Sequence, residues 1–440
     1  MSAQAASAAP RQALLPWTVS LFFAWGLATV LIDSLVPKLK ALFQLNYAEV
    51  MLTQFCFFLA YLLMSLPAGA LLARVVYVRS ILVGLTVMAG GCLLFTPAAK
   101  AGTYAGFLLA LFVMASGITL LQVAANPLVA LLGSEQTSHS RLNLAQAFNA
   151  LGTFVGPLLG SWLILRHGLA APADLAGLTP EALATYRKTQ AHDVQGLFWG
   201  IAAGLAVLVL LFWRFRFFRA EVERRQAGGT PVLELLRRPR LALGILSIFL
   251  YVGAEVSIGS VLTNYLMLPA VLGLGAASAG NCVSLYWGGA MVGRFIGSAV
   301  LRRAAPGLVL ACCAAGAALL ACTSALGTGL FAAAAILAVG LCNSIMFPTI
   351  FSLAIEGLGE DTPRGSSMLC VAIVGGAVVP VLTGHVADQA GLAWALLVPA
   401  LCYLGIAGYG LLARYRLASS AAADFRNGRL PAHYVPGSKV

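Results

Sequence analysis

The chain has 440 residues, of which 60% are hydrophobic and only 10% charged, and its mean hydropathy is +0.91. Soluble domains carry about 25% charged and about 45–50% apolar residues. This composition excludes a water-soluble enzyme or a nucleic-acid-binding module as the main interpretation. Long apolar runs also exclude an outer-membrane barrel, whose strands alternate in hydrophobicity. A helix needs about 20 apolar residues to cross a bilayer, so the length predicts an all-α polytopic membrane protein of about twelve spans.

Twelve apolar segments follow one another along the chain, and we interpret each as a transmembrane helix. They cover residues 17–37, 49–72, 79–97, 104–132, 143–166, 193–217, 241–269, 276–301, 306–326, 328–357, 366–388 and 391–415. Polar connections over residues 167–192 and 218–240 interrupt the series. We therefore expect two six-helix bundles, residues 1–217 and 241–415, joined by a cytoplasmic linker, 218–240, and followed by a cytoplasmic tail, 416–440.

Basic residues are distributed unevenly over the connections of this chain, whose net charge is +12. With the N-terminus in the cytoplasm, twenty Lys and Arg side chains lie inside and six outside. Cytoplasmic loops are enriched in these residues, so we expect a monomeric multi-pass protein in the lipid of the bacterial inner membrane, with both termini cytoplasmic and no nucleic-acid partner. The nine cysteines include no CxxC pair, so no disulfide, metal site or other cofactor is expected.

Proline follows a polar or aromatic residue at matching places in the two halves. Asn126-Pro127 lies in helix four and Phe347-Pro348 in helix ten, and the two prolines are 221 residues apart (348 − 127). Interrupted helices at corresponding places in two halves are typical of the central site of a transporter. We expect both helices to break at similar depth and to flank one central cavity.

Helix one carries an acid among apolar residues, and a polar group in hydrocarbon is costly unless it has a partner. Trp25, Thr29 and Asp33 lie on one helical face because they are spaced by four. We interpret Asp33 as a carboxylate that binds a proton or another cation, or else as a structural acid paired with Lys38. Trp25 offers a surface on which a sugar ring could stack.

Amides gather in helices four and five, where Gln122 and Asn126 share a face of one helix and Gln146 and Asn149 lie on the next. An amide both donates and accepts hydrogen bonds, as a hydroxyl group requires. These residues therefore suit a neutral polyol better than an ion. The alternative is that they bond helix to helix, as amides in membrane proteins commonly do.

The second half supplies further polar and aromatic candidates. Glu255 on helix seven could serve in ion coupling or as a salt-bridged gate. The remaining candidates for substrate binding are Asn264, Tyr265, Tyr286, Asn343 and Phe347.

Several motifs resemble one family. Residues 120–127 (LLQVAANP), 141–146 (RLNLAQ), 249–255 (FLYVGAE) and 343–351 (NSIMFPTIF) are similar to the fucose–galactose–glucose:proton symporters of the major facilitator superfamily. The resemblance covers residues 17–390 and implies two bundles that rock about a central sugar site. It places the family's helix-one carboxylate at Asp33 and its helix-five amides at Gln146 and Asn149. Gln122 replaces the Glu of fucose permeases, as in the glucose/galactose branch.

We therefore expect a transporter that imports a monosaccharide such as glucose or galactose by cation symport through alternating access, with the proton favoured as the coupling ion. Sodium coupling and an amino-sugar substrate remain open within the same family. A drug/proton antiporter is a weaker alternative, because the glycine-proline motif at 152–160 has Ser161 where that class has glycine. An enzyme is not expected, because the five histidines form no HxxxH pair.

Overall fold

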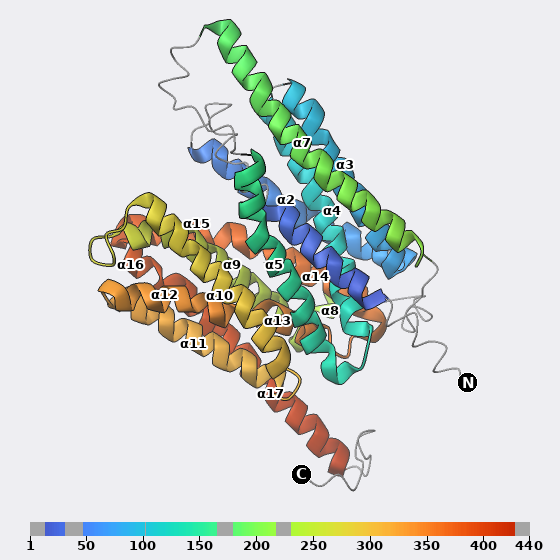
Figure 1. Cartoon of the computed structure of the whole chain (residues 1–440). Coiled ribbons are helices and arrows are strands. Elements are labelled where there is room, and N and C mark those ends of the chain that lie inside the picture. The colour runs from blue at the N-terminus through green and yellow to red at the C-terminus, as the bar shows by residue number, and fades with distance from the viewer. Residues whose placement is uncertain (1–13, 31–46, 102, 165–178, 217–229, 427–440) are drawn as a thin grey trace.

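The computed structural model of the chain describes residues 14–30, 47–101, 103–164, 179–216 and 230–426, and all regular structure within these ranges is helical (Figure 1). The first helix is Leu14–Val30. The other long helices are α2 (Tyr47–Val75), α3 (Tyr77–Ala101), α4 (Tyr104–Leu131), α5 (Ser138–Ile164), α7 (Pro180–Trp213), α9 (Pro239–Met267), α10 (Ala276–Val300), α11 (Pro306–Leu326) and α17 (Leu397–Arg426). Two spans each consist of two consecutive helices. One is α12 (Gly329–Asn343) followed by α13 (Met346–Ile355), and the other is α14 (Thr362–Val371) followed by α15 (Gly375–Ala390).

The helices follow the twelve predicted segments, and nine described stretches are long and apolar enough to cross a membrane by length and composition. Two boundaries differ from the prediction by more than ten residues. Helix α7 begins at Pro180, so the second part of the predicted connection 167–192 is helical. Helix α17 continues to Arg426, well into the predicted tail. Both extensions are less apolar than the spans that they continue, so the hydropathy pattern ends before the helix does.

The predicted break in helix four is wrong, whereas helix ten is broken. Helix α4 runs continuously through Pro127, and helix ten is interrupted at Ser344 and Ile345, just before Phe347-Pro348. Proline removes one helical hydrogen bond, which leaves the Val123 carbonyl of α4 without its usual donor. The Ser366 hydroxyl of α14 donates to this oxygen at 2.8 Å, and such side-chain donors let membrane helices continue through proline.

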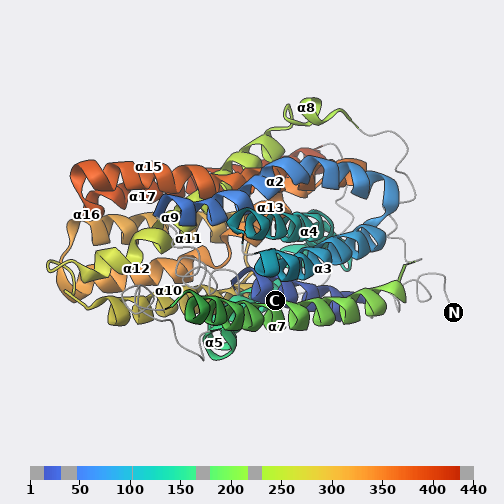
Figure 2. The same cartoon turned by 90° about the horizontal axis from the view of Figure 1, so that it is seen from above.

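The two halves of the chain pack side by side, as Figures 1 and 2 show. We call residues 14–216 the N-terminal half and residues 230–426 the C-terminal half. Helix α5 packs against α10, and α2 packs against α14, so these pairs join the halves. Within the C-terminal half, α10 and α12 approach closely because Gly340 faces the Tyr286 carbonyl, where a Cβ atom would overlap it.

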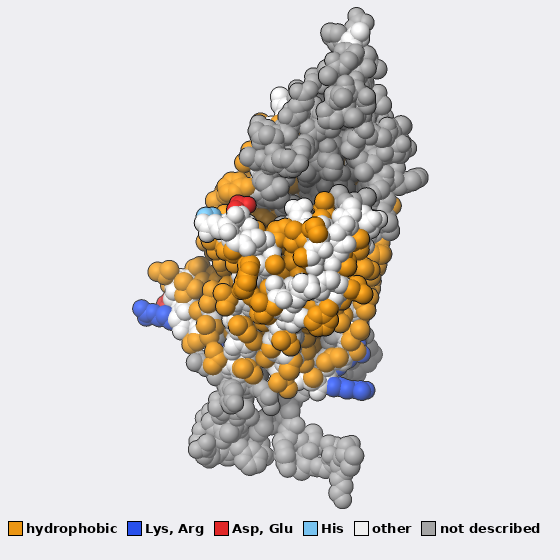
Figure 3. Space-filling model, turned by 90° about the vertical axis from the view of Figure 1, so that its left-hand side faces the viewer, with side chains coloured by type: hydrophobic (Ala, Val, Ile, Leu, Met, Phe, Trp, Pro, Cys, Tyr) orange, Lys and Arg blue, Asp and Glu red, His pale blue; other side chains and the backbone are white. Residues whose placement is uncertain are grey.

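Hydrophobic side chains are exposed around the helices. Leu210, Leu330, Phe331 and Val381 are each at least 70% exposed. Figure 3 shows that such side chains cover much of the described part of one face, with basic side chains at its margin. This distribution fits helices that are surrounded by lipid.

Short loops gather at one end of the molecule, which we call the arginine-rich end. It comprises residues 76, 132–137, 301–305 and 356–361 and the helix ends beside them, with Arg74, Arg79, Arg141, Arg302, Arg303 and Arg364. Arg141 closes the end of α4 by donating to the carbonyls of Val129 at 3.2 Å and Ala130 at 2.6 Å. Helix C-termini leave carbonyls unpaired, so this side chain completes α4 and fixes the turn into α5.

The chain after the polar connection is fastened to the same end. Asp361 accepts bonds from the Thr230 amide and hydroxyl, each at 3.0 Å, and from Arg238 at 2.9 Å. Arg364 donates to the Thr230 carbonyl at 3.0 Å. A short helix, α8 (Val232–Leu235), then leads into α9. Residues 230–238 are therefore held on the C-terminal half.

Candidate functional site

The amides predicted on helices four and five come together in the N-terminal half. Gln146 Nε2 lies 3.4 Å from Asn126 Oδ1, and both side chains are buried. Gln122 donates to the Tyr61 hydroxyl of α2 at 2.6 Å. Within the described part of the chain, Asn126 Nδ2 is buried without a hydrogen-bond partner. A buried donor without a partner is costly, so this cluster can donate a hydrogen bond to a further polar group.

Asn149 and Trp25 connect this cluster with the first helix. Asn149 Nδ2 donates to the Phe22 carbonyl at 3.0 Å, and Gly26 lets the two helices approach. The Trp25 ring packs on Phe22 with centroids 4.1 Å apart and is only 3% exposed. Asp33 and Lys38 lie outside the described residues.

A second polar cluster lies in the C-terminal half. The Tyr251 hydroxyl donates to Glu255 Oε1 at 2.7 Å, and Asn343 Nδ2 donates to the Tyr286 hydroxyl, also at 2.7 Å. The Tyr286 hydroxyl reaches the Glu255 carbonyl at 3.5 Å, and the Phe347 ring lies 6.4 Å from that of Tyr251. The structure thus brings together four of the predicted residues of this half.

The polar groups of this second cluster are not all satisfied. Asn343 is 1% exposed, and in the described structure its Oδ1 is buried without a hydrogen-bond partner. Among the described basic groups, none lies within 4.0 Å of the Glu255 carboxylate. The cluster therefore offers an unused acceptor beside a carboxylate whose partner is a tyrosine hydroxyl.

Two predicted residues lie elsewhere. Tyr265 is buried against α11, where its hydroxyl donates to the Ser324 carbonyl at 2.6 Å. Asn264 is exposed near the end of α9. Both are more than two helical turns beyond Glu255 along α9, and the structure does not bring them to the other candidates.

Side chains outside the predicted site connect the two clusters. Arg294 of α10 donates through Nε to the Ser344 carbonyl and through a terminal nitrogen to the Gln146 carbonyl of α5, both at 3.2 Å. Tyr61 and Tyr251 orient Gln122 and Glu255. An arginine inside an apolar segment was a visible signal for Arg294. The tyrosines carried no comparable signal, because an isolated tyrosine is common in apolar helices.

Both halves also meet at the arginine-rich end. The Ser140 hydroxyl donates to the Ser298 carbonyl at 2.7 Å, and the Ser298 hydroxyl donates to the Ser140 carbonyl at 3.1 Å. His139 Nδ1 lies 2.6 Å from the Ser352 hydroxyl. These buried contacts hold the halves together at this end.

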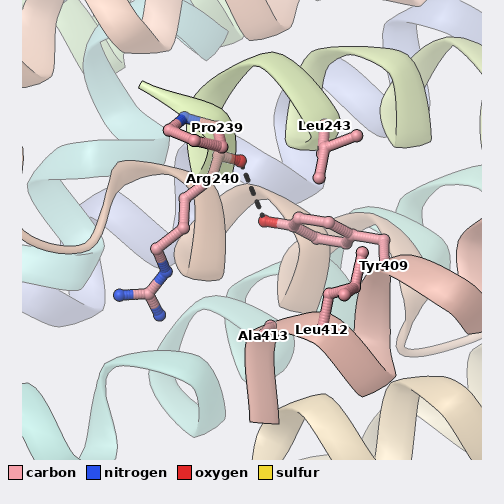
Figure 4. A pocket seen from close by; sticks show the side chains of 6 residues that line it. All are labelled: Pro239, Arg240, Leu243, Tyr409, Leu412 and Ala413. Carbon is pink, nitrogen blue, oxygen red and sulfur yellow. Dashed lines mark hydrogen bonds between the residues drawn. The ribbon is translucent and has the colours of Figure 1, made fainter. Parts of the chain in front are cut away.

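A small pocket lies beside the start of α9 (Figure 4). Its volume is about 30 Å³, and it is lined by Pro239, Arg240, Leu243, Tyr409, Leu412 and Ala413. Tyr409 donates to the Arg240 carbonyl at 3.3 Å, while the Arg240 guanidinium points away. Such a volume has room for one or two waters and is too small for a sugar, and its lining includes none of the candidate residues.

Comparisons with known proteins agree with the arrangement of helices and motifs. The family model described as Major Facilitator Superfamily matches residues 17–369. A glucose/galactose transporter of Brucella abortus is 48% identical over 89% of this chain and 92% of its own length. The L-fucose-proton symporter of Escherichia coli is 36% identical over 92% of this chain and 94% of its own length.

Solved structures give the same result. The crystal structure of the major facilitator superfamily transporter FucP in the outward conformation superposes with a TM-score of 0.85 and 34% identity, over 91% of this chain and 98% of that one. The human organic anion transporter MFSD10, at 17% identity and a TM-score of 0.62 over 91% of this chain and 99% of its own, shares the fold. The chain belongs to the major facilitator superfamily, in the family of sugar symporters that its motifs predicted.

Proposed function

We propose that this protein imports a monosaccharide together with a proton by alternating access between its two halves. The observation that carries the proposal is the pair of buried polar clusters, Gln122–Asn126–Gln146 in one half and Tyr286–Asn343 in the other. One has an unused donor at Asn126 and the other an unused acceptor at Asn343. Sugar hydroxyls both donate and accept, so a sugar between the halves could satisfy both.

Glucose or galactose is the favoured substrate class. Curated relatives at 48% and 41% identity are named as glucose/galactose transporters, the second as a putative one from Helicobacter pylori. The neutral pair of Gln122 and Tyr61 adds a hydrogen-bonding group without a charge. Trp25 and Asn149 complete the proposed substrate site of the N-terminal half, and Phe347 contributes an apolar ring from the other. Asn264 and Tyr265 lie away from both clusters, so they would contact the sugar only after a movement of α9.

Asp33 and Glu255 are the proposed coupling carboxylates. The Tyr251 hydroxyl donates to Glu255, and the Asn343 amide donates to the neighbouring Tyr286. Donors beside a carboxylate suit a group that gains and loses a proton, whereas hard metal cations need several oxygen ligands around them. This favours the proton over sodium.

We further propose that the arginine-rich end faces the cytoplasm of a bacterial inner membrane, because basic residues concentrate in cytoplasmic loops. Both termini then lie in the cytoplasm. The bundles would comprise residues 1–217 and 241–415 of a monomer surrounded by lipid, with 218–240 as the linker and 416–440 as the tail.

The test is uptake of labelled glucose, galactose, fucose and N-acetylglucosamine into proteoliposomes under an imposed proton or sodium gradient. We expect glucose and galactose to accumulate with a proton gradient, and a protonophore to abolish the accumulation. Protein-free liposomes provide the background. Accumulation that needs only sodium would contradict proton coupling, and the absence of uptake for every sugar would contradict the proposed function.

A further inference from the structure

The Val123 carbonyl of α4 has lost its helical partner. Pro127, four residues later, has no N–H group to donate to it. The donor instead is the Ser366 hydroxyl of α14, at 2.8 Å, which belongs to the other half of the chain. Val123 and Ser366 are both 0% exposed. The proline thus creates an acceptor in one half, and a serine of the other half occupies it in a buried interface.

The C-terminal half contains a counterpart. Pro348 leaves the Ser344 carbonyl without a helical donor, and Arg294 Nε donates to it at 3.2 Å. The same arginine reaches the Gln146 carbonyl of the N-terminal half at 3.2 Å. The two carbonyls are 221 residues apart (344 − 123), as are the prolines. In both halves, therefore, a carbonyl freed by proline is bonded to a side chain engaged at the interface.

The chain next to Ser366 packs closely against α2 of the N-terminal half. The next residue, Ser367, contacts Gly69 of α2 so closely that a Cβ atom on that glycine would overlap it. Further along the same interface, Gly376 faces the Phe58 ring of α2 in the same way. The bond to Val123 therefore forms only when α14 is seated directly against the N-terminal half.

We propose that Ser366 is a positioning residue of the transport cycle, and that its hydroxyl stabilises the conformation in which the halves are closed at the arginine-rich end. The proposal rests on alternating access as proposed above. When the halves separate there, α4 cannot supply a replacement donor because of Pro127, so water must take over the Val123 carbonyl. An alanine at position 127 would restore the helical N–H, and the carbonyl would then be satisfied in either conformation.

A double-mutant cycle tests this coupling, with Ser366→Ala, Pro127→Ala and the double variant. Ser367→Ala is the matched control, because this adjacent hydroxyl donates to the Arg364 carbonyl of its own helix at 2.7 Å. The readout is hydrogen–deuterium exchange of peptides covering residues 134–142 and 298–306 in lipid nanodiscs without sugar. Opening at the arginine-rich end exposes these segments, whatever the substrate or the coupling ion.

We expect Ser366→Ala to accelerate exchange of both peptides roughly 2- to 10-fold, the range that follows from loss of one ordinary hydrogen bond. Ser367→Ala should change it less than about 2-fold, and Ser366→Ala should add little in the Pro127→Ala background. Equal effects of Ser366→Ala in both backgrounds would overturn the proposal. If Pro127→Ala does not fold, equal exchange in Ser366→Ala and Ser367→Ala overturns it. Because no sugar is present, absent sugar uptake by the wild type would count against the proposed function alone.

Discussion

Replacing Gln146 by alanine tests the proposed sugar site, because the structure predicts a larger effect on sugar binding than on the stability of the protein. Gln146 is 6% exposed, and its amide lies 3.4 Å from Asn126 Oδ1, a long and weak contact. Loss of this contact should lower the free energy of unfolding by less than about 1 kcal/mol. A sugar hydroxyl leaves water when the sugar binds, and in this variant it no longer finds the Gln146 amide as its partner. The variant should therefore bind the sugar more weakly by about 1–3 kcal/mol, or about 5- to 150-fold in Kd.

Titration calorimetry with glucose and galactose measures the affinity, and thermal unfolding of the same preparation measures the stability. The matched control is Gln389→Ala, because Gln389 is an exposed amide on α15 that lies 3.1 Å from His385 and should leave both quantities unchanged. Asn149→Ala should weaken sugar binding by a similar amount and also lower stability, because Asn149 bonds the Phe22 carbonyl. Unchanged sugar affinity in both Gln146→Ala and Asn149→Ala would refute the site.

Three further outcomes are expected. Asp33→Asn should abolish uphill sugar uptake but leave counterflow exchange at least partly intact. In a coupled transporter, one charge crossing 100 mV supplies about 2.3 kcal/mol, which supports roughly 50-fold sugar accumulation. Any accumulation by the Asp33→Asn variant would exclude the coupling role. Glu255→Gln should give the same separation of uptake from counterflow, and a parallel loss of both would instead indicate a structural role. Gly340→Ala should lower the melting temperature, because its Cβ meets the Tyr286 carbonyl, whereas Gly384→Ala has open space and should not; equal melting temperatures would contradict the packing argument.

The sequence predicted the helices well because lipid imposes a simple rule on them. The segment 306–326 coincides with α11, since Pro306 begins it and an apolar run of membrane length fills it. The predicted break at Pro127 is wrong because the Val123 carbonyl finds another donor, Ser366, which lies 243 residues further along the chain than Val123. Local rules identify the carbonyl that loses its partner, but only tertiary packing decides whether another donor replaces it.

The candidate site shows the same limit. Spacing placed Gln122 and Asn126 on one face of helix four, and the structure keeps both in one polar cluster. Spacing could not identify Tyr61 as the partner of Gln122, because the rotation of α2 depends on its neighbours. Nor could it show that the Tyr265 hydroxyl is bound to Ser324 within one half. Periodicity defines a helical face, and packing defines what that face meets.

The attachment of Thr230 to Asp361 determines how the two halves are tethered. On the N-terminal side, Arg79 donates to the Arg216 carbonyl at 3.4 Å, so the chain is anchored at residues 216 and 230 on opposite halves. The thirteen residues between them, 217–229, can span at most about 45–50 Å when fully extended. A tether of this length keeps the halves at an effective concentration on the order of millimolar. Small tilts of the two bundles displace residues 216 and 230 by much less than this span. The tether therefore holds the halves together without determining which of their faces separate.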